Sequence, residues 1–547
     1  MFGLHETLPF ATMSSMNDLH YFRPDWVRPS DERLRVDVCI YGGTSAGLIA
    51  AVEARRRGKR VVVLHPGKIL GGLTTGGLGW TDYGRKNVIG GLSREFYRRL
   101  GKHYRKPEEF QFEPHAAGAV FGEMLRENDV PVRMGQYLDR VQTQDGRIEE
   151  VLMLGGLRAS ARVFIDATYE GDLMAQAGVS CTVGREDNDI YNETLNGIQV
   201  REFHQFSHPV DPFVRAGDPS SGLLPGILDE DLSAVQGRGD QRVQAYCFRM
   251  CMTDDPALKI DWPKPDGYDP LQYVLADRWF SGEKDDFNDQ LRGEGVHASV
   301  PVKFDIFPNK TPGGFHKTDT NNHGPFSSDF IGANHAWPQA SYEARERIFQ
   351  AHVTYQQGFY WHMANADGIP QRYRDAYRRW GLPKDEFTST GNWPYQLYVR
   401  EGRRMIGDYV ITEHDCRGTR VAEDSVGMGS YGMDSHNCAR FVKRDADGRA
   451  RVLNEGDVQV EAVPYPIPYR AIVPKRGQCP NLIVPVCLSS SHIAYGSARM
   501  EPVFMALGQS AAIAACRAID DNRAVQEIRY AEIRKALDTA GQVLTAR

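Results

Sequence analysis

The chain lacks the features that define several protein classes. It has 65 basic and 71 acidic residues, a formal net charge of -6, so it has no basic excess of the kind nucleic-acid-binding proteins carry. It has no run of about 18 apolar residues, which excludes a transmembrane helix from the expected elements. Its N-terminus has no basic start followed by an apolar run, as a secretory signal would. We therefore predict no nucleic-acid partner, no membrane partner and a cytoplasmic location.

Metal-binding and disulfide patterns are also absent. The nine cysteines are scattered and odd in number, and they form neither a CxxC pair nor a Cys/His zinc spacing. We expect free thiols, no metal site and no iron–sulfur cluster. No internal repeat or low-complexity tract occurs either. With 41% hydrophobic and 25% charged residues, the composition is that of a globular protein.

A strand, a glycine-rich turn and a helix follow one another from residue 36 onward. The sequence reads VDVCIYG, then GGTSAG, then LIAAVEARRRG, and a second apolar strand, KRVVVLH, comes next. This order is a βαβ unit in which both strands are buried and parallel. It is typical of dinucleotide-binding domains, where the helix N-terminus receives the pyrophosphate.

Each residue of the turn has an expected role. Gly42 permits the tight turn and Gly47 permits close helix–strand packing, whereas Thr44 stands where the GxGxxG pattern has its middle glycine. The predicted nucleotide contacts of the turn are Gly42, Gly43, Thr44, Ser45, Ala46 and Gly47. His65 stands where an acidic residue would bind the ribose. We expect a hydrogen bond to the adenosine ribose there; the alternative is a surface histidine that contacts nothing.

Three further stretches carry a family resemblance. They read ILGGLTTGGLGWTDYG, FIDATYEGDLMAQAGV and NLIVPVCLSSSHIAYGSARMEPVFMALGQSAAIAA. With the turn, they resemble the bacterial FAD-dependent oxidoreductases, flavoproteins of the glutathione-reductase type, over residues 35–520. The resemblance implies FAD as the cofactor. It implies cofactor contacts at Gly71, Gly72, Leu73, Thr74, Thr75, Ala167, Thr168, Ser489, Met500, Gly508 and Gln509.

The chain departs from the family pattern at two places. The strand of the third motif usually ends in Gly-Asp, whose aspartate binds the ribityl chain, and here Cys487, Leu488 and Ser489 stand there. Ser489 or the backbone is expected to substitute. Tyr169 replaces the glycine that usually follows Ala-Thr.

The last motif also predicts a long apolar helix that begins near Pro502. Proline suits the first turn of a helix, and the positive helix end would stabilise reduced flavin. The alternative is a plain buried helix.

The predicted fold class is α/β, a discontinuous Rossmann-like FAD-binding domain with a large inserted α+β cap domain. We assign residues 1–34 to an arm, 35–200 and 461–547 to the FAD-binding domain, and 201–460 to the substrate domain. Helices are expected near 341–380 and 394–413. The insertion is rich in Pro, Asn, His, Trp and Tyr and would cover the open face of the flavin.

Four residues are candidates for catalysis. His492 comes just before the closing helix and suits a proton acceptor near the flavin, while Arg499 would hold the flavin edge or a substrate anion. The alternative for both is a packing or salt-bridge role. His316 and His323 lie in the polar segment HKTDTNNHGPFSSD, which we interpret as a loop. Metal binding by that loop, or plain solvent exposure, is the alternative.

Substrate contacts are expected from amides and arginines. Asn321 and Asn322 belong to the same polar segment. Arg400 and Arg404, with Arg403, fall at helical i, i+3 and i+4 spacing, which predicts one face that binds a carboxylate or phosphate. A salt-bridged helix face explains the spacing equally well.

These observations predict an FAD-dependent dehydrogenase or oxidase that transfers hydride between flavin and a small polar, carbohydrate-derived substrate. Two alternatives stay open. One is a lyase or isomerase that uses FAD in an internal oxidation–reduction cycle, and the other is a flavin-bearing subunit of an electron-transfer complex. The electron acceptor is unknown, and the sequence leaves a homo-oligomer open.

Overall fold

The computed structural model describes residues 19–282 and 304–546, so residues 1–18 of the predicted arm lie outside it. Its largest sheet has seven strands. Five are parallel, in the order β3 (Val132–Met134), β2 (Val61–His65), β1 (Arg33–Tyr41), β6 (Arg158–Asp166) and β21 (Leu482–Ile483). The antiparallel strands β5 (Arg147–Met153) and β4 (Leu138–Gln144) continue from the first half of β6. Strands from both ends of the chain therefore build one sheet.

Alternate side chains of the parallel strands are buried on opposite faces of the sheet. Val38 and Ile40 point into a core with α1 (Ser45–Arg56) and α11 (Glu501–Asp521). Cys39 and Tyr41 point into a second core with β4, β5 and α4 (Asp172–Gln176). Because both faces are covered at Val38–Tyr41 and Val61–Leu64, these runs of β1 and β2 are apolar and buried, as the sequence indicated.

Further helices cover the α1 side of the sheet. The helices α2 (Gly91–His103) and α3 (Pro114–Glu127) pack on α1, and α12 (Tyr530–Thr539) packs on α11. The closing helix predicted to begin near Pro502 is confirmed as α11. Helix α11 is long and apolar enough to cross a membrane by length and composition, but 94% of its apolar window is buried inside the protein.

The middle of the chain forms several small sheets. The best defined has the order β11 (Phe304–Lys310), β12 (His316–Thr320) and β9 (Met250–Thr253). The other strands are β7 (Cys181–Thr182), β8 (Ile227–Leu228), β10 (Lys259–Ile260), β13 (Leu382–Pro383), β14 (Arg404–Met405), β15 (Ser425–Gly429), β16 (Met433–Ser435), β17 (Ala439–Arg444), β18 (Ala450–Glu455), β19 (Val458–Val460) and β20 (Tyr465–Pro468).

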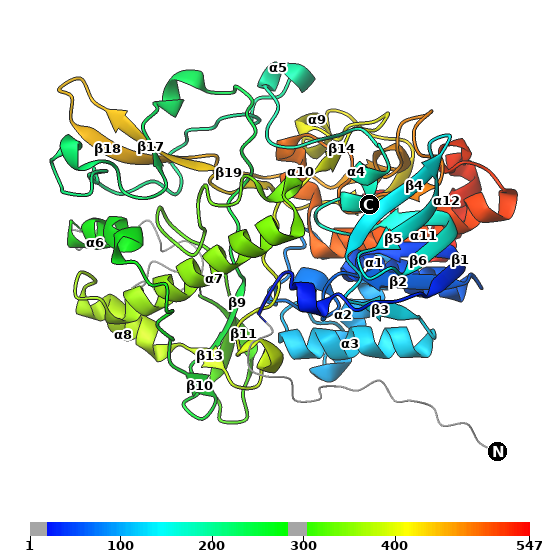
Figure 1. Cartoon of the computed structure of the whole chain (residues 1–547), viewed down its shortest axis with the longest axis horizontal. Coiled ribbons are helices and arrows are strands. Elements are labelled where there is room, and N and C mark those ends of the chain that lie inside the picture. The colour runs from blue at the N-terminus through cyan, green and yellow to red at the C-terminus, as the bar shows by residue number, and fades with distance from the viewer. Residues whose placement is uncertain (1–18, 283–303, 547) are drawn as a thin grey trace.

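The helices of the middle region are α5 (Asn188–Tyr191), α6 (Val274–Ser281), α7 (Tyr342–Asn365), α8 (Gln371–Arg379) and α9 (Glu413–Cys416). In Figure 1 the blue, cyan and red segments lie together on the right, and the green and yellow-green segments lie on the left. One apolar cluster nevertheless runs through both, from Val38 in β1 to Phe359 in α7. The helix predicted near 341–380 is confirmed as α7 and α8.

Two local predictions are wrong. The helix predicted near 394–413 does not form up to residue 412, because its arginines bond separate distant partners: Arg400 and Arg404 are buried and Arg403 is partly buried. The first five residues of the polar segment, His316–Thr320, are not a loop but the central strand β12, whereas residues 321–329 form neither helix nor strand. Its polar side chains are buried because acceptors and donors from elsewhere in the chain pair with them, as when Lys317 bonds Asp385 and Glu386 at 2.8 Å each.

Candidate active site

The glycine turn lies at the carboxyl end of β1, between β1 and β6. Gly42 has φ +106°, and a Cβ there would lie 2.8 Å from the Ala167 carbonyl carbon at the end of β6. A Cβ on Gly47 would lie 2.0 Å from the Gly42 oxygen. Both glycines are required by sterics. The chain continues from β1 toward β2 on one side and β6 lies on the other, so the turn sits at a switch point of the sheet, where α/β proteins bind ligands.

The N-terminus of α1 is held in this turn. Thr44 is the N-cap residue; its Oγ1 accepts from the Gly47 N–H at 3.4 Å and donates to the Ala167 carbonyl at 2.6 Å. The first N–H groups of a helix have no partner within the helix and attract anions. The turn is buried, as are Ser45 and Ala46. This geometry fits the pyrophosphate of a dinucleotide.

Glu501, the first residue of α11, faces the same turn, and sequence reasoning did not single it out. Its Oε2 accepts from the Ser45 and Thr74 hydroxyls, at 2.6 Å each, and its Oε1 accepts from the Tyr169 hydroxyl at 2.8 Å. The side chain is buried and forms no ion pair within the described residues. Burial raises the pKa of the Glu501 carboxyl, and the three hydroxyl donors oppose that shift. Its place beside Pro502 in the closing motif was the available signal.

His65 lies against the turn but contacts protein atoms. Its Nδ1 accepts from the Gly43 N–H at 3.0 Å, and its Nε2 bonds the Ile69 carbonyl at 2.8 Å. Burial lowers the pKa of His65 to about 4, so the imidazole is neutral. The predicted ribose contact stays a prediction, since both ring nitrogens have protein partners in this structure.

The loop after β2 passes beside Glu501. Gly71 and Gly72 have φ of +104° and +58°, a conformation that favours glycine. The Leu73 N–H donates to the Tyr169 hydroxyl at 2.9 Å, and the Thr75 hydroxyl donates to the Leu70 carbonyl at 2.6 Å.

Residues from the end of β6 and from the third motif are placed as follows. Thr168 donates its hydroxyl to Asp166 at 2.7 Å. Ser489 accepts the Gly407 N–H at 2.9 Å, and Met500 is the N-cap residue of α11. A Cβ on Gly508 would lie 2.3 Å from the Ala46 oxygen, so Gly508 permits α11 to approach α1 closely. The Gln509 Oε1 accepts the Leu92 N–H at 2.8 Å, which ties α11 to α2.

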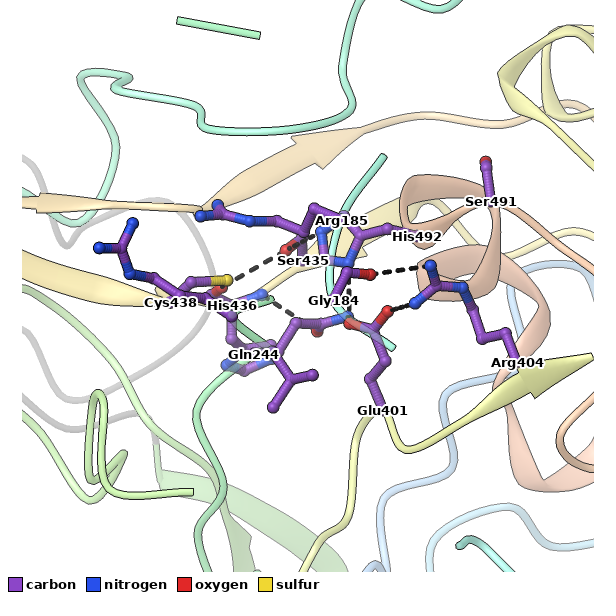
Figure 2. Close-up of polar contacts among 12 residues, drawn as sticks. Gly184, Arg185, Gln244, Glu401, Arg404, Ser435, His436, Cys438, Ser491 and His492 are labelled. Atoms are coloured by element: carbon purple, nitrogen blue, oxygen red, sulfur yellow. Dashed lines mark hydrogen bonds and ion pairs between the residues drawn. The ribbon is translucent and has the colours of Figure 1, made fainter. Parts of the chain in front are cut away.

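His492 stands at the start of α10 (His492–Ala498), inside a network that Figure 2 shows. Its Nδ1 lies 2.7 Å from a Glu401 carboxylate oxygen and its Nε2 lies 3.1 Å from the Ser435 hydroxyl. Glu401 also pairs with Arg404, which bonds Glu186 at 2.6 Å. His492 and Glu401 are buried, and both imidazole nitrogens are engaged.

The two predicted arginines meet at Tyr398. The guanidinium carbon of Arg400 lies 4.6 Å from the Tyr398 ring centre and that of Arg499 lies 5.5 Å away. Arg499 also donates to the Tyr398 hydroxyl at 2.7 Å. A third guanidinium, from Arg249, lies 6.0 Å from the same ring. The buried Nε atoms of Arg400 and Arg499 have no hydrogen-bond partner within the described chain. Arg403 and Arg404 point to other places, so the predicted common face does not exist.

Carboxylates surround these arginines. Arg249 forms two hydrogen bonds with Asp319, at 2.9 and 2.5 Å, and lies 3.4 Å from Asp82. The Asp82 and Asp434 side chains remain 22% and 20% exposed, so the group reaches solvent at these two residues. We name it the Tyr398 cluster, and it comprises Asp82, Arg249, Asp319, Asn321, Asp329, Tyr398, Arg400, Asp434, His436 and Arg499.

The remaining predicted residues lie apart from one another. Asn321 belongs to the cluster, where its Oδ1 accepts from Arg400 at 3.0 Å, and Asn322 is buried next to it in sequence. His316 lies 3.8 Å from Asp254, and the His323 ring packs 5.4 Å from that of His204. Among the described residues no group of three or more His, Cys, Asp or Glu is arranged to hold a metal ion. The nine cysteines are free thiols, as expected.

One surface hollow, of about 610 Å³, contains none of the predicted site residues. It is lined by residues 200–203, Gln236, Asp457 and Gln459. The candidate site is therefore defined by the glycine turn, Glu501 and the Tyr398 cluster. Arg499 connects these parts, because it lies two residues before Glu501 in the chain.

Comparison with known proteins gives a family. A family model described as "FAD dependent oxidoreductase" matches residues 37–537. No curated protein matches the sequence.

Solved structures with local similarity include flavoenzymes. L-proline dehydrogenase from P. horikoshii has 14% identity and a TM-score of 0.24, over 28% of this chain and 59% of its own. The amino acid oxidase NikD has 13% identity and a TM-score of 0.22, over 28% and 57%. The myxobacterial FAD-dependent halogenase CndH has 18% identity and a TM-score of 0.20, over 28% and 41%. This chain thus spans less than two thirds of each of these proteins.

Proposed function

The chain belongs to the family of FAD-dependent oxidoreductases, and from this membership we propose that it oxidises a small polar substrate bound at the Tyr398 cluster. FAD is the cofactor of the family and supplies the hydride acceptor when bound. The residues present fit it, because the buried N-terminus of α1 offers N–H groups that have no partner within the helix.

The composition of the Tyr398 cluster supports a polar, hydroxyl-bearing substrate. Guanidinium groups bind carboxylates and ring oxygens, and carboxylates accept hydrogen bonds from hydroxyls. The exposed parts of Asp82 and Asp434 are the members that a substrate would meet first. A carbohydrate-derived molecule offers both kinds of partner, which favours that class within the proposal.

We further propose that residues 201–460 act as the cap over the cofactor. This segment supplies Arg249, Asp319 and Tyr398, whereas residues 461–547 supply Arg499 and Glu501. Part of the substrate site would then come from the insertion and part from the cofactor-binding ends of the chain. The cluster closes the site against water through its buried ion pairs.

The first experiment is an absorption spectrum of the purified protein before and after acid precipitation. We expect flavin bands that move into the supernatant, which means non-covalent FAD. Polyhydroxylated alcohols, sugar acids and amines are then screened anaerobically for bleaching of those bands. A colourless protein that FAD cannot reconstitute contradicts the proposal. Turnover without any external acceptor would instead identify an internal oxidation–reduction cycle.

A further inference from the structure

Two histidines lie close to the candidate site, and they differ in one respect. His492 has both ring nitrogens engaged, with Glu401 at 2.7 Å and Ser435 at 3.1 Å. His436 bonds Asp329 through Nδ1 at 2.8 Å, and no other hydrogen bond of its ring occurs in the described part of the chain. Its Nε2 faces Asp434, 3.8 Å away, and its side chain is 8% exposed. His436 therefore has a nitrogen available for a proton.

The hydrogen bond to Asp329 determines which nitrogen that is. Asp329 is buried and pairs with Arg400 at 2.8 Å, so it remains ionised and accepts the Nδ1 proton. The lone pair of the neutral ring then lies on Nε2. A carboxylate that fixes the tautomer of a histidine base is the arrangement found in Ser-His-Asp hydrolases, although no such nucleophile is implied here.

The charges around His436 favour a neutral ring that can become charged. Burial lowers its pKa below the usual value and Arg400 adds to that effect, while Asp329 and Asp434 oppose it. Arg499 stands behind Asp434, 3.5 Å from its carboxylate. The Asp434 carboxylate would stabilise the imidazolium formed when Nε2 takes a proton.

His436 is also connected to the cofactor turn by a short path. It follows β16, whose residue Asp434 accepts a hydrogen bond from Arg499 at its backbone oxygen, at 3.0 Å. Arg499 precedes Glu501 by two residues, and Glu501 bonds Ser45 of the turn. Helix α10 packs directly on this strand, since a Cβ on Gly496 would lie 2.5 Å from the Asp434 oxygen.

We propose that His436, rather than His492, is the proton acceptor of the oxidation, with Asp329 as its positioning residue. The inference rests on the proposed function. In the oxidation of an alcohol the O–H bond breaks and its proton goes to Nε2, while the electron pair forms the carbonyl. The carbon loses hydride, two electrons and one proton, to FAD. His492 then serves to hold Glu401 and Arg404 in place.

The test combines chemical modification with kinetics on the holoenzyme. Diethyl pyrocarbonate reacts with neutral imidazole, and peptide mapping by mass spectrometry locates the adducts. We expect an adduct on His436 and on the exposed His103, but none on the buried His352 and His492. H436N is expected to slow anaerobic bleaching by a substrate from the screen about 10²- to 10⁴-fold. The matched control is H362N: His362 is buried and bonds Tyr268 and Asp277, which lie outside the cluster, so this variant keeps the wild-type rate.

The pH profile separates a proton acceptor from a structural role. In the wild-type protein the bleaching rate rises with pH as His436 loses its proton. In H436N this rise of the rate with pH should be absent. D329N keeps the imidazole but removes the charge that raises its pKa, so the rise of the bleaching rate with pH should move to lower pH.

Three results would overturn the inference: an unmodified His436 beside a modified His103, a wild-type bleaching rate in H436N, or a bleaching rate in H436N that rises with pH as in the wild-type protein. If no polar substrate bleaches the wild-type protein, the proposed function itself fails.

Discussion

Glu501 is a buried carboxyl that faces the glycine turn and has no counter-ion in the part of the chain that the structure describes. It is held by hydroxyls only, from Ser45, Thr74 and Tyr169, and it lies at the N-termini of both α1 and α11. Two helix N-termini stabilise a carboxylate, but a pyrophosphate bound at the same turn would bring further negative charge. We therefore expect the protonation of Glu501 to be linked to cofactor binding.

This linkage gives a prediction for the affinity of FAD. Burial already raises the pKa of Glu501, and a bound pyrophosphate raises it further. Between the free and bound pKa values, binding takes up a proton, so affinity falls as pH rises, by at most about tenfold per pH unit. E501Q has no proton to take up, and its affinity should be independent of pH in that window. Titration of the apoprotein with FAD, followed by fluorescence quenching at several pH values, measures the affinity. The same change of log Kd with pH in E501Q and in the wild-type protein would contradict the prediction.

Among single residues, sequence reasoning was most accurate where backbone geometry decides. Gly42 and Gly47 are required by φ and by close approach, and both could be predicted because only glycine satisfies these demands. His436 and Glu501 could not, because nothing local in the sequence distinguishes one buried polar residue from another. Arg400 and Arg499 were selected separately, and only the fold brings them to one tyrosine.

At the scale of elements, the packing of α11 on α1 depends on a small residue. A Cβ on Gly508 would lie 2.3 Å from the Ala46 oxygen, a backbone atom that cannot rotate away. We expect G508A to lower the free energy of unfolding by about 2–4 kcal/mol, more than a Gly→Ala change gains in helix propensity. The control is G118A on α3, where a Cβ meets nothing within 4 Å; it should stabilise by about 0.5–1 kcal/mol. Urea denaturation of both variants measures the difference.

A second carboxyl joins the beginnings of two helices. The Glu193 Oε1 accepts from the Glu413 N–H of α9 at 2.7 Å and from the hydroxyl of Ser491, the N-cap residue of α10, at 2.6 Å. Burial raises its pKa to about 7. For an acid, a raised folded-state pKa gives stability that is present below the unfolded pKa and is lost as pH rises through about 7.

We therefore expect wild-type stability to fall between pH 5.5 and 8 through this group. The loss over this interval is about 2 kcal/mol, because stability falls by 1.36 kcal/mol per pH unit over the roughly 1.5 units between pH 5.5 and the folded-state pKa of about 7. E193Q cannot ionise at this position. Over the same pH interval its free energy of unfolding should therefore fall by about 2 kcal/mol less than that of the wild-type protein. Urea unfolding at both pH values decides, and identical pH dependence in the two proteins would contradict the prediction.

At the scale of the whole molecule, the chain behaves as one packed body. The same apolar cluster contains Val38 of the central sheet and Phe359 of the insertion. The N-terminal segment also contacts the insertion, because the backbone N–H groups of Tyr21 and Phe22 donate to Glu346 of α7, at 2.8 and 2.9 Å. Because this apolar cluster extends across both parts, we expect them to unfold together.

Tryptophan and flavin signals can test this cooperativity. Six of the eight tryptophans lie in the insertion: Trp262, Trp279, Trp337, Trp361, Trp380 and Trp393. Tryptophan fluorescence thus follows the insertion, and flavin release follows the ends of the chain. Both transitions should have the same urea midpoint. Two separate midpoints would mean that residues 201–460 unfold independently.

The sequence by itself determined the βαβ unit, the required glycines, the apolar closing helix and the family with its FAD cofactor. These follow from local periodicity, from backbone dihedral angles and from long motifs, all of which are contiguous in the chain. It did not determine the strand at His316–Thr320, the path of residues 394–403 or the Tyr398 cluster. Polar residues there are buried only because charges of opposite sign arrive from distant segments, and such pairing is decided by tertiary structure.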